Sequence, residues 1–344
     1  MRRPPSSVIV RQLRENAFLA GMLGAIALAS AAPSIGRSGG PLHGELLADA
    51  GIFLVFLLHG ASLSGAAVRE GMSRWRLHLV VQLFTFVVFP VVWLVLAAAF
   101  GHWVPAPLRP GFFFLAALPS TISSSVAMTA IARGNVPGAI FNAVLSNVLG
   151  IVITPVLVGA ASAHAGSGPP LGRAILGIAG LVLVPLAAGQ ALRPVTGTWL
   201  ARHRGRTSSI DKCVVVLIVY VAFCDSAAAG LWSGHGPRLV AFAILGALAL
   251  LASVLALTTA VAGWLGFEKE DEIAAVFCGS KKALSSGVAM AKVLFGAQAG
   301  VTVLPVMCYH QLQLFVCSAL AERYARRAEP GGDGHAPLTR RPAH

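Results

Sequence analysis

The sequence predicts an all-α, polytopic membrane protein with ten transmembrane helices that form two inverted five-helix repeats. Three observations lead to this prediction. Of the 344 residues, 56% are hydrophobic and only 11% are charged, whereas a soluble domain carries about 25% charged residues. Apolar runs long enough to span a bilayer follow one another along the chain. A short serine-rich motif occurs twice, in the fourth and in the ninth of these runs.

Ten apolar runs delimit a predicted transmembrane domain, residues 16–325. The runs are Asn16–Ala32, Leu46–Leu63, Leu77–Phe100, Gly111–Ala132, Pro137–Ala161, Leu171–Leu192, Lys212–Gly230, Leu239–Phe267, Ile273–Phe295 and Val301–Ala321. The first run resembles a secretory signal peptide, because Arg2 and Arg3 precede it and small residues end it. We expect it to be retained, since its removal would leave nine spans and break the repeat.

The loop charges predict the orientation. Nineteen Lys and Arg residues lie in the two tails and after every second span, whereas the other loops hold four, Arg37, Arg109, Arg173 and Arg238. Basic loops stay in the cytoplasm, so we expect both termini there, with residues 1–15 as a tail and 326–344 as a disordered tail. The net charge of +13 is spread over these loops and forms no basic domain, which argues against nucleic-acid binding.

The repeated motif predicts the symmetry of the fold. Residues 123–128 (SSSVAM) match residues 285–290 (SSGVAM) in five of six positions. The two motifs fall in spans four and nine, so the repeat unit is five spans and the repeats cover residues 16–161 and 171–321. Because five is an odd number, the second repeat enters the membrane upside down relative to the first, as in many secondary transporters.

Spans four and nine are predicted to be broken helices. In span four, Pro119 removes a backbone hydrogen bond, and hydroxyl side chains follow it from Ser120 to Ser125. Freed backbone groups beside hydroxyls can bind ions or polar substrate groups. The alternative is an ordinary kinked helix whose serines pack closely. The twin motif in span nine favours a binding site.

Lys281 and Lys282 are the most unusual residues of span nine. A charge at membrane depth costs roughly 2.5–3.5 kcal/mol, so it normally marks a site or a pathway. The alternatives are snorkelling to the interface and a structural ion pair. Adjacent helical positions point about 100° apart, so both lysines are not expected to reach one surface. Lys292, near the end of the span, is expected to snorkel.

Other polar residues at membrane depth complete the candidates. Asp225 could bind a proton or a cation, pair with a lysine, or lie at a solvated helix end. Amides in spans five and ten could line a site or hold helices together, and His59 and Gln82 are secondary candidates. The five cysteines show no paired spacing and predict neither a disulfide framework nor a zinc site. No cofactor is expected.

Several segments resemble the bile acid:sodium symporter superfamily. They are Leu118-Pro119-Ser120-Thr121, Ile131–Val136 and Leu145-Ser146-Asn147. Two further stretches, Phe277–Lys282 with Gly287 and Arg74–Leu79 with Phe84–Phe86, resemble its divergent bacterial SBF-like branch, which also has eukaryotic relatives. The similarity covers nearly all of residues 10–325.

The resemblance implies a two-domain transporter in the inner (plasma) membrane of a bacterium. A panel domain, spans one, two, six and seven, would face a core domain, spans three to five and eight to ten. The broken helices four and nine would cross in the core, and movement of the core against the panel would give alternating access.

The resemblance also bears on the coupling ion. Sodium-coupled members hold their ions with a Ser-Asn pair in span four and a Glu and a Gln in span nine. Here span four has a serine run without the asparagine, and span nine has no carboxylate. We therefore do not expect sodium coupling, and a proton is the other candidate.

These features predict a secondary transporter for a small organic anion, and no enzyme. Lysines beside half-helix amide ends attract anions, and a tethered ammonium could also take the place of a bound cation. The predicted binding residues are Thr121, Ser123, Ser124, Ser125, Asn135, Asn142, Ser146, Asn147, Ser280, Lys281, Lys282, Ser285, Ser286, His310 and Gln311.

Two other functions compete with transport. One is a membrane-embedded enzyme that uses Cys278 or Asp225 with a histidine, for which the sequence offers no nucleophile–base motif. The other is a non-transporting regulator or partner subunit, which would leave the doubled polar crossing unexplained. Besides the substrate and membrane lipids, a second copy of the chain, forming a homodimer, is the partner considered.

Overall fold

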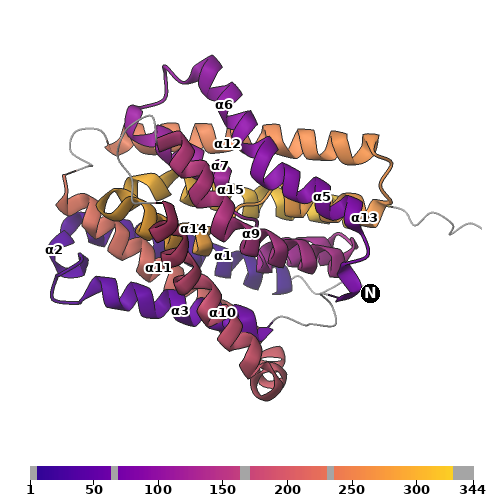
Figure 1. The fold of residues 1–344 in the computed structure, drawn as a ribbon, viewed down its shortest axis with the longest axis horizontal. Helices are drawn as coiled ribbons and strands as arrows, with labels where there is room; N and C mark the ends of the chain where they lie inside the picture. Colours follow the sequence, from indigo (N-terminus) through magenta and orange to yellow (C-terminus); the bar gives the residue numbers. More distant parts are fainter. Residues whose placement is uncertain (1–5, 63–68, 163–170, 231–235, 328–344) are drawn as a thin grey trace, which may run out of the picture.

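The computed structural model describes residues 6–62, 69–162, 171–230 and 236–327, and this part of the chain contains helices and no strand (Figure 1). The helices are α1 Ser6–Ala31, α2 Pro33–Gly36, α3 Gly44–Ser62, α5 Trp75–Leu83, η1 Phe84–Val88, α6 Phe89–Phe100, η2 Ala106–Leu108, α7 Arg109–Ala117, α8 Ser123–Ile131, α9 Val136–Ser162, α10 Leu171–Arg202, α11 Arg204–Ala228, α12 Gly236–Trp264, α13 Lys269–Gly279, α14 Leu284–Phe295, η4 Gly296–Gln298 and α15 Ala299–Ala325. Of the predicted tails, residues 1–5 and 328–344 lie outside the described residues.

In the described part of the chain, seven helical segments are long and apolar enough to cross a membrane, judged by length and composition. They are Gly44–Ser62, Trp75–Phe100, Val136–Ala161, Gly172–Arg202, Gly205–Ala228, Pro237–Trp264 and Lys269–Ala325. A shorter apolar helix covers Ala20–Ala31. Predicted span four is divided between α7 and α8, and predicted spans nine and ten lie within the last segment. The protein is therefore an all-helical protein with several apolar helices of membrane-spanning length, and the ten-span arrangement stays a prediction.

Several helices continue beyond the apolar runs that predicted them. Helix α1 begins at Ser6, so residues 6–15 of the predicted tail are helical. Helix α10 continues to Arg202, past the predicted end at Leu192, and α11 begins at Arg204, before the predicted start at Lys212. An apolar run ends where charges begin, but a helix continues through Arg, Thr and Lys, which are acceptable helix residues.

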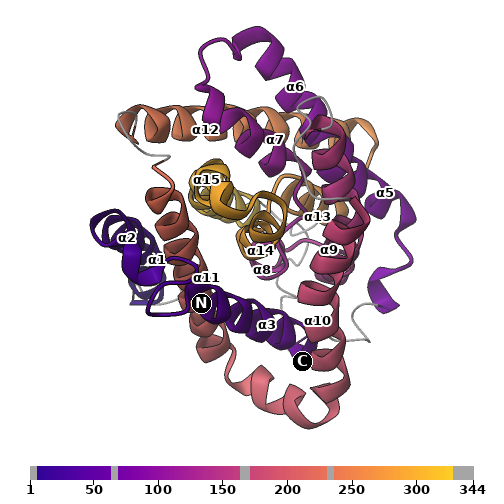
Figure 2. The same ribbon diagram turned by 60° about the vertical axis from the view of Figure 1, so that its left-hand side comes forward.

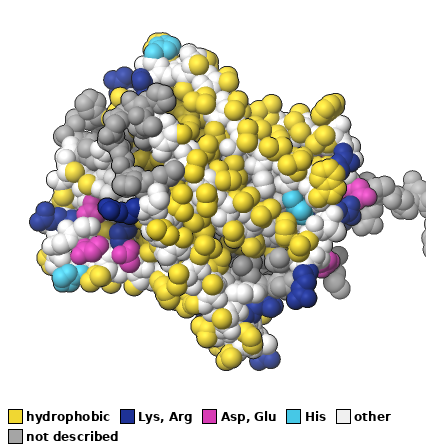
Figure 3. All heavy atoms as spheres, viewed as in Figure 1, with side chains coloured by type: hydrophobic (Ala, Val, Ile, Leu, Met, Phe, Trp, Pro, Cys, Tyr) yellow, Lys and Arg dark blue, Asp and Glu magenta, His cyan; other side chains and the backbone are white. Residues whose placement is uncertain are grey.

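The surface separates apolar from charged side chains along the long axis. Hydrophobic side chains cover the middle of the face in Figure 3, and most charged side chains gather towards its two ends. Large apolar residues are strongly exposed, among them Leu176, Val195 and Trp264 at 74%, 80% and 84%. A soluble protein rarely exposes so continuous an apolar surface, and a bilayer solvates one.

The long helices pack in two groups. Helices α1, α3, α10 and α11 contact one another along one side of the molecule (Figure 2). Helices α12 and α15 pack together, α8 packs on α9 and α13, and α7 packs on α6 and α15. The half-helices α8 and α14 lie between these two groups in the same view.

Both predicted helix breaks are present. Helix α7 ends at Ala117 because Leu118 precedes Pro119, whose ring disfavours a helical residue before it, and Leu118 is extended with φ −69° and ψ 153°. Helix α8 starts only at Ser123. In the second break, α13 ends at Gly279 and α14 starts at Leu284.

Candidate functional site

The two helix breaks lie against each other at the centre of the molecule. The Ala283 amide donates a hydrogen bond to the Pro119 carbonyl at 2.9 Å. The hydroxyls of Ser120 and Ser125 donate to the carbonyls of Cys278 and Phe277, at 2.6 and 3.1 Å. The first break and the start of α8 thus exchange hydrogen bonds with the second break and the end of α13.

Side chains of the neighbouring helices α9 and α15 satisfy the remaining backbone groups. The Ser120 amide donates to the Ser146 hydroxyl at 2.9 Å, and the Asn147 amide group donates to the Ser120 carbonyl at 2.9 Å. The side chain of Gln313 accepts from the Lys282 amide and donates to the Lys282 carbonyl, both at 2.9 Å. Buried backbone groups away from water need such partners, so these side chains stabilise the breaks.

Lys282 is held by backbone carbonyls deep inside the crossing. Its side chain is 0% exposed. The ammonium donates to the carbonyls of Thr85, Ala116 and Leu118, at 2.7, 2.8 and 2.6 Å, and lies 4.0 Å from the centre of the Phe89 ring. A lysine ammonium has three hydrogens, so all its donors are used. No carboxylate is among these partners.

The geometry of the helices explains why these three carbonyls have no backbone donor. Ala116 and Leu118 belong to the C-terminal end of α7, where carbonyls have no intrahelical donor and carry the negative end of the helix dipole. Thr85 lies in the π-helix η1, in which the Phe89 amide donates to the Phe84 carbonyl, five residues back. The same spacing pairs Thr85 with Pro90, which has no N–H. The Thr85 carbonyl therefore accepts from Lys282.

Lys281 and Lys292 have different partners. Lys281 is also 0% exposed, and its ammonium donates to the Ser124 carbonyl at 2.9 Å. The ammonium of Lys292 donates to the Asp49 carboxylate at 2.7 Å and to the Glu45 carbonyl at 2.9 Å, both on α3, and the expectation that Lys292 snorkels stays a prediction. Lys292 therefore joins α14 to the neighbouring group of helices.

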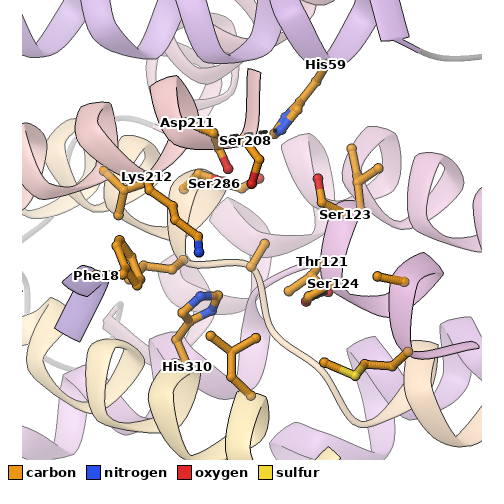
Figure 4. Close-up of a pocket in the computed structure, with 18 of the residues that line it drawn as sticks. Phe18, His59, Thr121, Ser123, Ser124, Ser208, Asp211, Lys212, Ser286 and His310 are labelled. Carbon is orange, nitrogen blue, oxygen red and sulfur yellow. Dashed lines mark hydrogen bonds and ion pairs between the residues drawn. The ribbon is translucent and has the colours of Figure 1, made fainter. Parts of the chain in front are cut away.

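A cavity of about 280 Å³ lies beside the crossing (Figure 4). Seven of the predicted binding residues line it, namely Thr121, Ser123, Ser124, Asn147, Ser285, Ser286 and His310. Lys281 and Lys282 are not among the residues that line it. Both lysines instead hold the crossing behind the cavity wall, with Ser125, Ser146 and Ser280.

The N-terminal turns of α8 and α14 both form part of the cavity wall. Ser123 and Ser124 begin α8, and Leu284 to Ser286 begin α14. The residues that precede the two helices, Ile122 and Ala283, have no side chain that caps the first amides. The Ser125 amide of α8 donates to the Thr121 hydroxyl at 3.2 Å. Each helix N-terminus carries about +0.5 elementary charge and amides that have no intrahelical acceptor. The cavity therefore has two anion-attracting ends on one wall.

The opposite wall carries charged residues that the sequence analysis did not select. Lys212 points into the cavity between Phe18 and His310 in Figure 4, with its ammonium 5.7 Å from the centre of the Phe18 ring. Asp211 precedes it, and an Asp211 carboxylate oxygen lies 3.7 Å from Nε2 of His59. The apolar run began only at Lys212, so both residues were read as loop residues. Helix α11 starts at Arg204, so both residues lie inside the helix, and hydropathy alone does not show this.

Four other candidates lie away from the cavity. The side-chain amides of Asn135 and Asn142 donate to the Asp271 carboxylate at 2.7 Å and to the Gly138 carbonyl at 3.0 Å. Gln311 contacts the sulfur of Met22. Asp225 accepts two hydrogen bonds from Ser38, from its amide at 2.7 Å and from its hydroxyl at 2.9 Å, at the far end of α11.

Comparison with known proteins adds the family. Residues 16–326 match the model of the SBF-like CPA transporter family. An uncharacterized protein of Pseudomonas aeruginosa is 43% identical over 93% of this chain and 95% of its own, and YfeH of Escherichia coli, named as a prospective symporter, is 40% identical over 83% and 86%. Sodium/bile acid cotransporter 7 of Xenopus tropicalis is 30% identical over 91% and 92%. The chain belongs to the SBF-like CPA transporter family.

In this SBF-like transporter the crossing does not fit a sodium ion at the Lys282 position. Three carbonyls and an aromatic ring surround the point where the ammonium lies. Carbonyl oxygens are suitable ligands for a hard cation, but here they already hold a positive charge of the chain itself. A second cation at the same carbonyls would meet that charge at close range.

Proposed function

We propose that this SBF-like protein is a secondary transporter that moves a small organic anion across the bacterial inner membrane by alternating access. The observation that carries the proposal is the cavity itself. It has two half-helix N-termini on one wall and the Lys212 ammonium on the other. Among the described residues, no hydrogen-bond acceptor contacts this ammonium, so it is available to a ligand.

The lining of the cavity supports an organic anion as substrate. Apolar side chains such as Phe18, Val215, Leu284 and Leu314 line it beside the hydroxyl and cationic groups. Ligand sites of this kind bury the apolar part of a ligand and fix its orientation with a few polar groups. An anionic group would lie at the helix N-termini, and the apolar part would contact the aliphatic and aromatic wall.

The packing of the helices supports alternating access. Helices α1, α3, α10 and α11 would form the panel, and the remaining long helices the core. His59 and the cavity lie towards the C-terminal end of α3, and the Lys292–Asp49 ion pair lies towards its N-terminal end. With both termini in the cytoplasm, the cavity lies towards the cytoplasm and the ion pair holds panel and core together near the periplasm. This is the arrangement expected of an inward-facing state.

The inverted repeat has support of its own. In the first half, side chains of α9 satisfy the break between α7 and α8, and in the second half α15 does the same for the break between α13 and α14. Span five thus satisfies the backbone groups of the break in span four, and span ten does the same for the break in span nine. We propose ten spans on this basis, with each broken pair of helices counted as one span.

Sodium independence is part of the proposal. Lys282 fixes a positive charge at the C-terminal carbonyls of α7, where a mobile cation would otherwise be needed to neutralise the helix end. We assign no catalytic role to Cys278, whose thiol is buried and faces the Ala139 carbonyl.

A thermal-shift screen tests the proposed function. The purified protein is heated with a set of organic anions, in sodium chloride and in choline chloride. Ligand stabilisation follows RT ln(1 + [L]/Kd), so weak ligands also register at high concentration. We expect stabilisation by at least one anion to the same extent in both salts. Stabilisation by neutral or cationic compounds alone would contradict the proposed substrate class.

A further inference from the structure

A proton bound at the cavity wall would strengthen the attraction of the cavity for an anion. Asp211 is the one carboxylate among the described residues that line the cavity, and it lies next to Lys212. Their charges cancel when His59 is neutral. One proton on Asp211 or His59 leaves a net charge of +1 on this wall. An anion then enters a cavity with a complementary charge.

Asp211 and His59 are arranged to share such a proton. Nε2 of His59 and the near oxygen of Asp211 are 3.7 Å apart, too far for a hydrogen bond. This oxygen and Nδ1 of His59 are buried and have no hydrogen-bond partner in the described part of the chain. A buried polar atom without a partner is unfavourable. A shared proton would turn the gap into a charge-assisted hydrogen bond.

Few other groups in the described part of the chain could take the proton. Among the described side chains, the charged or titratable groups that face Asp211 are His59 from α3 and Lys212 from its own helix. His310 from α15 lies across the cavity, where its Nδ1 contacts the Gln313 amide at 2.9 Å. Among the described side chains, those of α1 and α14 that line the cavity are Phe18, Leu284, Ser285 and Ser286, none of which titrates.

We propose that Asp211 and His59 form a proton-binding site that couples proton movement to anion movement. This inference rests on the proposed function and adds its coupling ion. The pair takes one proton from the solution on the side where the anion enters. It returns that proton to the solution on the side where the anion leaves. Asp211 and His59 lie on the panel helices, across the cavity from the crossing that contains Lys281 and Lys282.

Thermodynamic linkage gives the proposal a measurable signature. If a proton increases the affinity for the anion, the anion increases the affinity for the proton by the same factor. The Kd for the anion should rise by up to about tenfold per pH unit while the pair loses its proton. Asp211→Asn removes the negative charge permanently and should hold the cavity in its high-affinity state.

The experiment measures anion binding to the full-length protein by calorimetry, from about pH 5.5 to about pH 8. The probes are benzoate and a series of arylsulfonates, because a sulfonate keeps its charge over this range and only the protein titrates. We expect wild type to bind more tightly at low pH. Asp211→Asn should bind with the same Kd at every pH, close to the low-pH value of wild type.

Asp225→Asn is the matched control, because it makes the same change on the same helix away from the cavity. It should keep the pH dependence of wild type. A pH-independent wild type, or an Asp211→Asn variant that keeps the wild-type pH dependence, would overturn the coupling site and leave the proposed function intact. Absence of binding at every pH would overturn both.

A second variant covers the case in which Asp211→Asn does not fold. His59→Gln removes the other half of the pair and keeps a polar side chain. It should move the midpoint of the pH profile, because the proton no longer has two sites to share. An unchanged midpoint in this variant would also overturn the proposal.

Discussion

Lys282 occupies a place at the crossing where a cation could otherwise bind. Its ammonium makes three hydrogen bonds to carbonyls that belong to two other helical segments, η1 and α7. A free cation would bind the same oxygens but could leave. A tethered one cannot leave. At the residue scale, this difference is the basis of the proposed sodium independence.

Lys282→Met should destabilise the protein far more than Lys281→Met. The first change leaves three buried carbonyls without a donor, whereas Lys281 has one carbonyl partner, Ser124. Breaking a buried charged network typically costs about 3–5 kcal/mol, and one lost hydrogen bond costs about 1–3 kcal/mol. The measurement is the melting temperature of both variants in detergent. Equal falls in melting temperature would contradict the role of the three carbonyls that hold Lys282.

Lys282→Ala tests the ion-replacement idea more directly. The truncation leaves room for a small cation beside the three carbonyls. We expect methylammonium or sodium to raise the melting temperature of this variant and to leave wild type unchanged, with choline as the reference salt. A variant that no small cation stabilises would show that the carbonyls do not form a cation site.

Lys212→Met should weaken anion binding without unfolding the protein. The ammonium points into the cavity, so its loss removes one charged partner of the ligand. Removing such a partner costs about 2–5 kcal/mol, a loss of affinity well above tenfold. Calorimetry with the anion selected by the thermal screen measures the change. Lys269→Met, outside the cavity, is the control and should bind like wild type, and normal binding by Lys212→Met would contradict the site.

At the residue scale, local features could be predicted from the sequence, whereas contacts between distant residues could not. The sequence indicated that Lys281 and Lys282 belong to the crossing, because two charges in an apolar run are costly. It could not indicate the acceptors, because Thr85 and Leu118 come to Lys282 only through the tertiary fold. It also missed Asp211, because hydropathy marks the end of an apolar run and not the end of a helix.

At the scale of the elements, the breaks in the two helices were the most predictable feature. Pro119 ends α7 by its effect on Leu118, a local rule that needs no tertiary information. The break between α13 and α14 has no proline, and it was predicted from its motif and its glycines. The π-helix η1 was not predicted, because no sequence motif marked the shift of one residue in its hydrogen bonds.

The Lys292–Asp49 ion pair makes a prediction about the movement of α14 against α3. Asp49→Lys or Lys292→Asp alone places like charges together at this contact and should favour separation of the two helices. The double exchange restores opposite charges and should restore the transport rate. We expect each single variant to transport the selected anion more slowly than wild type, by proteoliposome uptake. Wild-type rates in both single variants would show that the pair does not hold this end closed.

At the scale of the whole molecule, the charge distribution predicts the topology. Nineteen basic residues lie on one side and four on the other, so reporter fusions at Arg204 and at the C-terminus should both report a cytoplasmic location. A fusion near Gly234 should report a periplasmic one. A result in which Arg204 and the C-terminus lie on opposite sides would contradict the ten-span arrangement.

The fold class was readable from the sequence because a bilayer imposes strong rules on composition and length. The number of spans is harder to read from length alone, since breaks shorten the apolar helices of spans four and nine. The cavity could not be predicted in full. One wall comes from the repeated motif, and the other comes from α3 and α11, whose polar residues follow no motif.

Uptake by proteoliposomes tests the central claim most directly, namely that the crossing site moves an organic anion without sodium. The purified protein is reconstituted, and uptake of the selected radiolabelled anion is measured in sodium and in choline, with Lys212→Met as the inactive comparison. The account predicts saturable uptake at the same rate in both salts and its loss in Lys212→Met. Uptake that requires sodium, or that persists unchanged in Lys212→Met, would contradict it.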